Sequence, residues 1–400
     1  MKIGMMVDSY KPYISGITNY VEVNKEFLEK AGHEVFVFTF GDLEHEDGER
    51  NVIRSPGLPL ADSGFFLSLR YSRQAKKLLQ TMDIVHVHHP FLSGRLALRY
   101  CRPAGIPIVF TNHSRYDLYA QAYLPMMPDE VSQGMLQAYM PPFCKAMDLV
   151  ITPSAGMEKV LRELKVEGNI EIIPNGVNLE SFQNTKPIPR ESLGYKPGDI
   201  LIVYAGRVAL EKNLPFLIDS FAGVAKAIPN VHLLIIGGGV QQFEEDIRDH
   251  VEEKNLPDRI HLVGKVPYDQ LPAHLAMCDI FATASVTEVH PLSVIEAMGT
   301  GLPVMGIESV GVGDTVRDGV TGFLAANDMS SFTAKLTRLC LDPSLRNSMS
   351  RAARAASEAY AIERTTRIML ECYERVVANT DRHRENLNLR LRGILEKFLR

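Results

Sequence analysis

Residues 284–306 read ASVTEVHPLSVIEAMGTGLPVMG and combine a helix with the strand that follows it. Leu292 and Ile295 recur at helical spacing and predict a helix with an apolar face. Pro291 suits the first helical position, where its missing N–H is no loss. Gly301 is expected to end the helix, and the apolar residues after it begin a strand.

The same stretch carries two carboxylates near a helix N-terminus. Glu288 lies just before the predicted helix, and Glu296 lies in its second turn. A helix N-terminus concentrates unpaired N–H groups and partial positive charge, so it favours an anion, whereas carboxylates accept hydrogen bonds from hydroxyls. A nucleotide-sugar has an anionic centre with hydroxyls on both sides and fits this description. Two solvated glutamates on a surface helix are the alternative interpretation.

The composition indicates a soluble globular protein of two domains. The 400 residues are 46% hydrophobic and 23% charged, and the net charge of −5 gives no basic field for nucleic acid. The five cysteines are scattered without a CxxC pair, which fits a reducing compartment. The N-terminus has no signal-peptide core and no apolar run reaches ~18 residues, so we expect a cytoplasmic protein without a membrane span.

Apolar runs alternate with helical stretches in the first half of the chain. A short apolar run at residues 2–8 is followed by a loop and by a helix expected over 17–31, which stops at Gly32. Fully apolar strands that alternate with helices are typical of a parallel sheet covered on both faces. The further strands expected in this half are 35–40, 84–88, 108–111, 149–152 and 170–173.

The alternation breaks at a linker and then restarts. Pro174-Asn175-Gly176 is a turn sequence, and residues 184–199 are rich in Pro, Gly and charge. The strands expected after the linker are 200–205, 231–236, 260–263, 280–284 and 303–307, and the chain is predicted to be helical after Asn327.

The sequence therefore predicts two doubly wound, Rossmann-like α/β domains that face each other across a cleft. Ligands bind at the carboxyl ends of the strands in such folds. We expect an N-terminal domain over 1–185, a C-terminal domain over 186–360, and C-terminal helices over 361–400, the first of which returns to the N-terminal domain.

Two glycine-containing loops are candidates for phosphate binding. Gly16 lies between the first strand and a helix, where it permits close approach of the backbone to a phosphate. Gly237-Gly238-Gly239 follows a later strand, but Gln242 occupies a position that is Gly or Ala in the dinucleotide fingerprint. The sequence has no P-loop either, so neither NAD nor ATP binding is well supported.

Arg207 and Lys212 follow the first strand of the second domain. At the carboxyl end of that strand they could grip a diphosphate, the arginine as a fork and the lysine as a point charge. A solvated cation and a helix-cap pair are the alternative. The presence of Glu288 and Glu296 in the same domain favours the binding interpretation.

The first domain carries a cluster of histidines at two strand ends. The spacing of His86, His88 and His113 does not match HExxH, and no carboxylate or cysteine nearby completes a metal set, so we expect no metal site. His86 and His88 alternate on one side of a strand end, which favours polar lining of the cleft. Tyr116 and Tyr119 follow in a polar-aromatic loop at its mouth. A buried, structural His113 is the alternative.

These motifs together resemble glycosyltransferase family 4, a family of retaining, nucleotide-sugar-dependent enzymes with the GT-B fold. The likeness covers nearly the whole chain. It rests on Gly32-His33-Glu34-Val35, Pro174-Asn175-Gly176-Val177-Asn178, Gly206-Arg207 with Lys212-Asn213, Glu288 and Glu296 separated by seven residues, Glu296-Ala297-Met298, Gly301-Leu302-Pro303-Val304 and Gly319-Val320-Thr321-Gly322-Phe323.

The resemblance implies how the donor is held. Arg207 and Lys212 would bind the diphosphate. Glu296 would accept the ribose hydroxyls, and Glu288 would accept a hydroxyl of the donor sugar. The other donor contacts implied, largely through the backbone, are Gly16, Val266, Val289, His290 and Leu292. Where the family often reads Glu-x-Phe-Gly this chain has Pro291, which has no N–H to offer.

The resemblance also implies an acceptor side and a mechanism. His113 would lie near the reactive end of the donor sugar, and the catalytic set would be His113, Arg207, Lys212 and Glu288. The acceptor side would include His86, His88, Tyr116 and Tyr119. Front-face attack with retention needs positioning and stabilisation of diphosphate charge, so we expect no metal or other cofactor beyond a UDP- or GDP-linked sugar as co-substrate.

The loop at residues 111–119 resembles that of the bacterial diacylglycerol glycosyltransferases, which make membrane glycolipids. Residues 64–70 place apolar side chains beside Arg73, Lys76 and Lys77, and residues 387–400 form a basic amphipathic helix of a kind that binds anionic bilayers. Internal packing of both segments, or a dimer contact, is the alternative.

We therefore expect transfer of a hexose to a membrane lipid such as diacylglycerol, with peripheral binding to the inner face of the cell membrane. A transferase acting on a soluble sugar or polysaccharide precursor is the alternative of the same class. A nucleotide-sugar-binding protein without catalysis is the alternative of a different class. The sequence leaves the base, the sugar and the linkage open.

Overall fold

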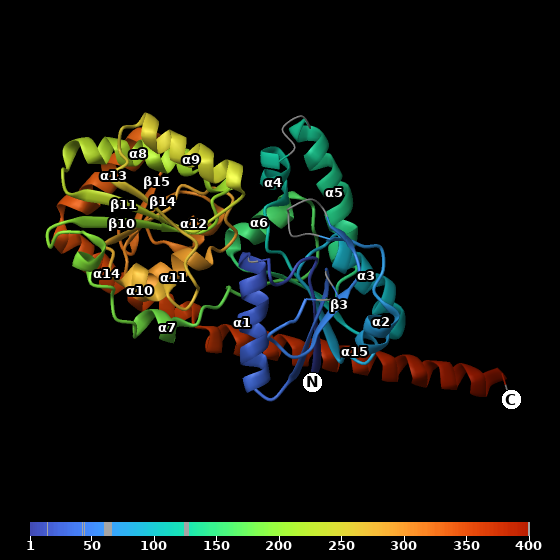
Figure 1. Cartoon of the computed structure of the whole chain (residues 1–400). Coiled ribbons are helices and arrows are strands. Elements are labelled where there is room, and N and C mark those ends of the chain that lie inside the picture. Colours follow the sequence, from blue (N-terminus) through green and yellow to red (C-terminus); the bar gives the residue numbers. More distant parts are fainter. Residues whose placement is uncertain (14, 42, 44, 60–65, 124–127, 399–400) are drawn as a thin grey trace.

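The computed structural model describes residues 1–400 except 14, 42, 44, 60–65, 124–127 and 399–400, and it leaves the side chains of 120–123 and 381–398 undescribed. Two lobes stand side by side, each with a sheet covered by helices (Figure 1). The two larger sheets contain seven and six strands, and all of the pairings within them are parallel. The predicted pair of doubly wound α/β domains is confirmed.

The N-terminal sheet has the order β3-β2-β1-β6-β7-β8-β9, so the chain reverses direction across the sheet between β1 and β6. Its strands are β1 (Lys2–Met6), β2 (Glu34–Phe40), β3 (Val52–Ser55), β6 (Ile84–Val87), β7 (Ile108–Thr111), β8 (Leu149–Thr152) and β9 (Ile170–Ile172). Its helices are α1 (Gly16–Lys30), α2 (Arg73–Leu79), α3 (Leu92–Tyr100), α4 (Tyr116–Tyr123), α5 (Asp129–Lys145) and α6 (Ala155–Glu163), with a 3-10 turn η2 (Arg102–Ala104) and a small antiparallel pair β4 (Leu58–Pro59) and β5 (Phe66–Leu67).

The C-terminal sheet has the order β12-β11-β10-β13-β14-β15 and reverses between β10 and β13. Its strands are β10 (Ile200–Ala205), β11 (Val231–Ile236), β12 (Ile260–Gly264), β13 (Ile280–Ala282), β14 (Val304–Ile307) and β15 (Gly322–Ala325). The remaining elements are α7 (Leu179–Gln183), η3 (Arg190–Leu193), η4 (Leu210–Lys212), α8 (Leu214–Ala227), α9 (Gln241–Glu253), α10 (Leu271–Ala276), α11 (Leu292–Thr300), α12 (Val310–Thr315), α13 (Met329–Leu341), α14 (Pro343–Ser357), η5 (Glu358–Tyr360) and α15 (Ile362–Phe398).

Helix α11 is the helix predicted within residues 284–306, with two differences. It begins at Leu292, and Pro291 is the capping residue before it rather than its first residue. Residues 294–299 are all buried, so the helix lies inside the domain instead of presenting a single apolar face. Gly301 ends it with a left-handed φ of 93°, and the amide of Leu302 returns to the carbonyl of Ala297 at 2.9 Å.

Helix α15 connects the end of the C-terminal domain to the N-terminal domain. The chain crosses back beside Val177, whose amide and carbonyl bond Tyr360 and Ile362 at 2.9 and 3.0 Å. Tyr373 and Met369 are then buried in the core beneath β1 and β2. Figure 1 shows the helix running from the edge of the C-terminal lobe, below the N-terminal lobe, to the C-terminus. Where several helices were expected over 361–400, the structure has one.

The predicted strands agree with the structure within a few residues, but two edge strands were missed. Both β3 and β15 have four residues, and β3 contains Arg54 while β15 begins with Gly322. Four residues that include an arginine or begin with a glycine are too short a run to be told from a turn or loop by periodicity. Among the described helices, none is both long and apolar enough to cross a membrane.

Candidate functional site

Arg207 follows β10 and is held by an acid from the next turn. Its Nη2 donates to Oε1 of Glu211 at 2.5 Å, and the Glu211 side chain is fully buried. The Arg207 carbonyl accepts the hydroxyl of Tyr204 at 2.9 Å, which fixes the backbone at the strand end. The guanidinium is therefore aimed by a buried carboxylate while 37% of its side chain stays exposed to a ligand.

Lys212 and Glu288 form the second charged pair of this domain. The Lys212 ammonium lies 2.5 Å from Oε1 of Glu288, and both side chains are more than four-fifths buried. Burial alone would raise the pKa of Glu288, but the Lys212 charge outweighs it and holds this pKa below its usual value. Both groups are therefore ionised near neutral pH, where the carboxylate accepts hydrogen bonds and the ammonium attracts an anion.

The N-terminus of α11 lies just beyond Glu288 and has no side-chain cap. Pro291 occupies the capping position, where Ser, Thr, Asp or Asn would supply an oxygen. The first N–H groups of the helix, at Leu292 and Ser293, are thus available to an outside acceptor. A helix of nine residues adds its dipole to these donors.

Val289 and His290 anchor the donor-side loop to the N-terminal domain. The carbonyl of Val289 accepts Ser154 Oγ, and that of His290 accepts Asn175 Nδ2, each at 3.0 Å. The Val289 side chain packs into the N-terminal core, and the His290 ring meets Tyr360 edge-on at 5.0 Å. The Val289 side chain thus packs across the domain boundary, whereas His290 reaches the N-terminal domain through its carbonyl and packs its ring on Tyr360.

Glu296 lies deeper in α11 and is buried apart from the charged pairs. Its Oε1 accepts the hydroxyl of Tyr268 at 2.7 Å. Burial raises the pKa of Glu296 to about 7, although the Tyr268 hydrogen bond partly opposes the rise. Val266 and Leu292 pack partly buried against the core of the same domain. Glu296 is therefore a hydrogen-bonding carboxyl that is only partly ionised at neutral pH.

The triplet Gly237-Gly238-Gly239 has a packing explanation. A Cβ atom at Gly237 would lie 1.8 Å from the carbonyl oxygen of Gly206, and one at Gly239 would lie 1.8 Å from that of Val208. The amides of Gly206 and Val208 bond the carbonyls of Ile236 and Gly238 at 3.0 Å. These glycines therefore let two loops pair closely and hold the segment that begins with Arg207.

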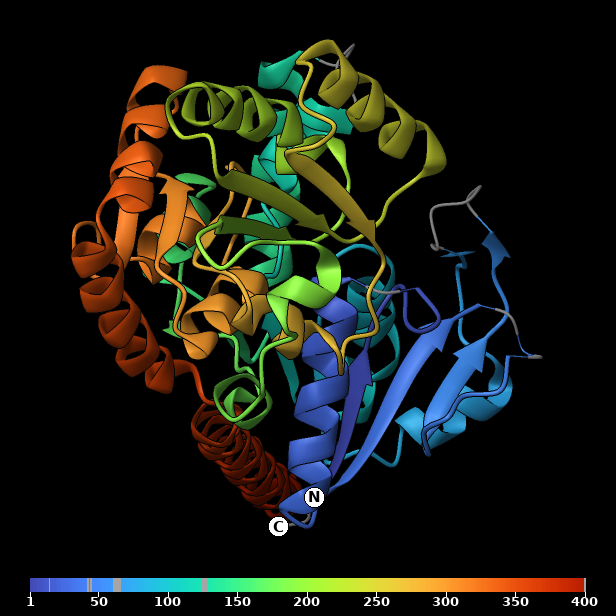
Figure 2. The same ribbon diagram turned by 60° about the vertical axis from the view of Figure 1, so that its left-hand side comes forward.

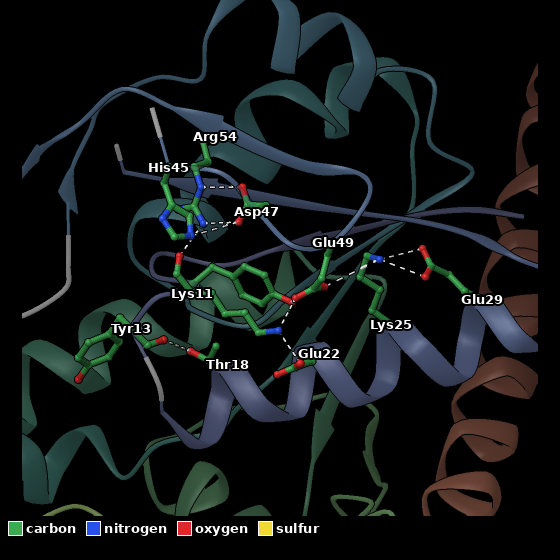
Figure 3. Close-up of polar contacts among 11 residues, drawn as sticks. Lys11, Tyr13, Thr18, Glu22, Lys25, Glu29, His45, Asp47, Glu49 and Arg54 are labelled. Carbon is green, nitrogen blue, oxygen red and sulfur yellow. Dashed lines mark hydrogen bonds and ion pairs between the residues drawn. The ribbon is translucent and has the colours of Figure 1, made fainter. Parts of the chain in front are cut away.

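Gly16 opens α1, which lies at the boundary with the C-terminal domain (Figures 1 and 2). Ser15 caps this helix by accepting the amide of Thr18 at 3.1 Å. A Cβ at Gly16 would meet no atom within 4 Å, so the fold itself does not require glycine here. Figure 3 shows charged side chains around the preceding loop.

The histidines form a buried column in the N-terminal domain. His86 is fully buried, with Tyr373 Oη at 2.5 Å from Nδ1 and Thr111 Oγ1 at 2.7 Å from Nε2, so the structure places it in the core and not on a cleft wall. His88 Nδ1 lies 3.0 Å from His113 Nε2. Burial lowers the pKa of His86 to about 3 and also lowers the pKa of His88 and His113, so the column is neutral.

Tyr116 and Tyr119, both predicted on the acceptor side, have different surroundings in the structure. Tyr116 opens α4 and meets Phe91 edge-on at 5.2 Å, against the core of its own domain. Tyr119 lies one turn later and faces the other domain. Burial raises the pKa of Tyr119, and its hydroxyl also interacts with the charges of Lys212 and Glu288. Tyr119 thus joins the charged site, whereas Tyr116 packs internally.

Several residues of the site were missed from the sequence. Glu211, Tyr268 and Tyr13 each contact a predicted donor residue. Tyr268 comes two residues after Val266, which was a predicted donor contact. Nothing in the sequence indicated that Tyr268 bonds Glu296. Glu211 has the appearance of a solvated acid in sequence, and only its burial shows otherwise.

Two parallel α/β domains, with charged pairs and an uncapped helix at the ends of the second sheet's strands, define a protein of the GT-B type. The comparisons agree. Residues 14–181 match the family described as Glycosyltransferase Family 4, and residues 185–356 match the family described as Glycosyl transferases group 1. The chain belongs to this glycosyltransferase family, as its motifs predicted.

Two curated relatives carry the same description. The alpha-monoglucosyldiacylglycerol synthase of Acholeplasma laidlawii is 28% identical over 381 residues, which cover 91% of this chain and 94% of that protein. The alpha-monoglucosyldiacylglycerol synthase of Streptococcus pneumoniae is 27% identical over 363 residues, which cover 86% of this chain and 80% of that protein.

Solved structures show the same fold. The sucrose-phosphate synthase of Thermosynechococcus elongatus superposes with a TM-score of 0.79 at 23% identity and covers 94% of this chain and 99% of its own. HepE of Anabaena, in complex with UDP and glucose, gives 0.74 at 20% identity with coverage of 94% and 99%. At these identities the likeness concerns the fold.

Proposed function

We propose that this glycosyltransferase transfers a hexose from a UDP- or GDP-linked sugar to a membrane lipid such as diacylglycerol, with retention of configuration. The observation that carries the donor part is the Lys212–Glu288 pair, 2.5 Å apart, beside the uncapped N-terminus of α11. It combines a cation, a hydroxyl acceptor and free N–H donors, which are the groups needed to hold a sugar diphosphate.

Each part of the donor has a residue suited to it. Arg207, aimed by Glu211, and Lys212 would stabilise the charge that develops on the departing diphosphate. Glu288 would accept a hydroxyl of the sugar. Glu296 would accept the ribose hydroxyls, with the hydroxyl of Tyr268 giving way or sharing the carboxyl.

The reaction requires positioning more than a protein nucleophile. In our proposal the acceptor hydroxyl attacks from the face that the diphosphate leaves, and the leaving phosphate takes the acceptor proton. His113, held by His88, would act as a neutral hydrogen-bonding group on the acceptor side. The two cations and the helix N-terminus supply the role that a metal ion has in other transferases, so we propose no metal and no further cofactor.

The lipid part of the proposal is supported by the two relatives, both named as glucosyldiacylglycerol synthases, and by one surface. Strand β4 and the segment between β5 and α2 expose apolar side chains, Leu58 and Leu69 by 72% and 78%. Basic residues follow Leu69 closely in the chain, at Arg70, Arg73, Lys76 and Lys77. Apolar anchors beside several cations fit an anionic bilayer, so we propose peripheral binding of this surface to the inner face of the membrane. The side chains of 381–400 lie outside the described residues.

A donor screen tests the activity. Radiolabelled UDP-, GDP- and ADP-sugars are incubated with the protein and a bacterial lipid extract, and labelled glycolipid is separated by chromatography. We expect one UDP- or GDP-hexose to label a lipid, with activity retained in EDTA. Label only in soluble products would contradict the lipid acceptor, and nucleotide binding without any transfer would contradict the enzyme.

Vesicle co-sedimentation tests the membrane surface. We expect the wild type to bind vesicles containing phosphatidylglycerol, and the double variant Leu67→Ser with Leu69→Ser to bind at least about threefold less. Leu193→Ser, at a leucine outside this surface that is 50% exposed, is the control. A form ending before Asp381 measures the share of the C-terminal segment. Equal binding by wild type and double variant would contradict this surface.

A further inference from the structure

The loop between β1 and α1 reaches across the domain boundary at Tyr13. Arg207 Nη1 donates a hydrogen bond to the Tyr13 hydroxyl at 3.4 Å, although the two residues are 194 positions apart in the chain. Arg207 is thus contacted on two sides, by Glu211 of its own domain and by Tyr13 of the other. No residue role implied by the family resemblance covers Tyr13.

The loop that carries Tyr13 is fixed by an ion-pair network at Lys11. The Lys11 ammonium binds Glu22 of α1 and lies 2.5 Å from Oε1 of Glu49. Glu49 also accepts the hydroxyl of Tyr10 at 3.1 Å. Burial would lower the pKa of Lys11, but the two carboxylates outweigh it and raise this pKa, so the Lys11 ammonium stays charged near neutral pH. Figure 3 shows Lys11 between its two acids.

Backbone contacts hold the same loop on either side of Lys11. Arg54 of β3 donates Nη2 to the Lys11 carbonyl at 2.5 Å and binds Asp47 with two hydrogen bonds, at 2.6 and 2.9 Å. The Tyr13 carbonyl accepts Thr18 Oγ1 at 3.1 Å, and the Tyr13 amide returns to the Tyr10 carbonyl at 3.2 Å. These contacts restrict the position from which the Tyr13 side chain extends.

We propose that Tyr13 is a positioning residue of the donor site, supplied by the N-terminal domain, and that the Lys11–Glu22–Glu49 network and Arg54 hold it in place. Its hydroxyl and the Glu211 carboxylate fix the Arg207 guanidinium before a diphosphate arrives. An arginine held at two points loses less freedom when it binds phosphate, so the contact strengthens donor binding. The proposal rests on the proposed function, because it assumes that Arg207 binds the diphosphate.

The phenol of Tyr13 contributes through its hydroxyl, so Tyr13→Phe is the first test. We expect the Kd for UDP or GDP, whichever the wild type binds, and the donor KM to rise about three- to tenfold while kcat stays within about twofold. In an Arg207→Gln background the same change should have no further effect, because the hydroxyl acts through Arg207. Equal losses in both backgrounds would overturn the proposal.

Variants of the network and a remote control complete the experiment. Lys11→Met should raise the same Kd in the same range, Lys11→Arg should restore it, and Tyr13→Phe should add little to Lys11→Met. Tyr195→Phe is the control, because its ring packs on His232 and His261, elsewhere in the C-terminal domain. Unfolding temperatures measured in parallel separate lost binding from lost fold.

The outcomes separate this inference from the function on which it rests. A wild type that binds neither UDP nor GDP would overturn the proposed function and this inference together. A wild type that binds one nucleotide, with an unchanged Kd in Tyr13→Phe, would overturn the positioning role alone.

Discussion

The two domains carry different polar groups at the carboxyl ends of their strands. After β10 and β13 the C-terminal domain has two salt-bridged pairs, Arg207–Glu211 and Lys212–Glu288. At the carboxyl ends of β6 and β7 the N-terminal domain has the column of His86, His88 and His113, which burial keeps neutral.

In the proposed function this difference separates two tasks, donor binding and acceptor binding. A diphosphate needs fixed positive charge, and the attraction between the two is stronger where water is excluded. An uncharged acceptor needs hydrogen-bonding groups that do not compete for the donor's charge. The same sheet topology thus supplies two kinds of site, and the kind depends on whether the polar residues at the strand ends are paired ions or buried imidazoles.

The largest expected effect is on the charged side. Lys212→Ala removes the proposed phosphate ligand and leaves Glu288 without its salt-bridge partner, so we expect kcat/KM to fall about 10²-fold. Arg207→Ala should lower it at least about tenfold. Lys254→Ala, which breaks a salt bridge of 2.7 Å to Asp219 elsewhere in the domain, is the matched control and should change little. Near-normal turnover in Lys212→Ala and Arg207→Ala would contradict the proposed role of the charged pairs.

The second prediction concerns pH and Glu296, whose pKa is about 7. Ribose hydroxyls donate to the ionised carboxylate, so nucleotide affinity should rise about tenfold between pH 6 and pH 8. Glu296→Gln should weaken nucleotide binding and flatten this profile, as measured by calorimetry at both pH values. A slope that survives in Glu296→Gln would assign the titration to another group.

The same group predicts a change in stability with the opposite sign. The folded-state pKa of Glu296 lies above that of an unfolded glutamate, so the folded protein loses stability as pH rises through about 7. Glu296→Gln removes this loss and should raise the unfolding temperature at pH 8 but not at pH 4. A variant that is less stable at pH 8 would contradict the assignment.

The third prediction concerns the neutral side. His88 Nε2 is buried without a partner, and an orphaned N–H is rarer than an orphaned acceptor, so the shared proton belongs on His88 Nδ1, directed at His113. His88→Leu should lower kcat/KM about fivefold, and His88→Gln, which can still donate, should retain most of it. Equal losses in both variants would mean that His88 only fills space.

The smallest effect is expected at the loop between the two sides. Gly16→Ala should leave the unfolding temperature unchanged, because the added methyl meets no atom within 4 Å. The donor KM should rise about threefold if the donor approaches the backbone there. An unchanged KM would show that Gly16 does not contact the donor. The donor would then be bound by the charged residues of the C-terminal domain alone.

The sequence predicted the fold because the signal for it is local. Apolar runs such as residues 200–205 and 231–236 report burial on both faces of a strand, and their alternation with helices implies a parallel sheet. The ends of those strands then placed Arg207, Lys212 and Glu288 on one edge of one domain. The two short edge strands were missed, because four residues are too few to give a clear strand signal.

The pairings at the site depended on the tertiary structure. Lys212 and Glu288 are 76 residues apart, Arg207 and Tyr13 are 194 apart, and His86 and Tyr373 are 287 apart. Sequence periodicity reports which face of an element is buried, but not which distant side chain covers it.

The sequence alone therefore determined the two-domain architecture and the identity of the residues that we propose bind a nucleotide-sugar. The tertiary structure decided how these residues act: it buried His86 in the core, paired Lys212 with Glu288 and raised the pKa of Glu296. The reason is that charge state and orientation depend on desolvation and on partners from other elements, which only the packed chain brings together.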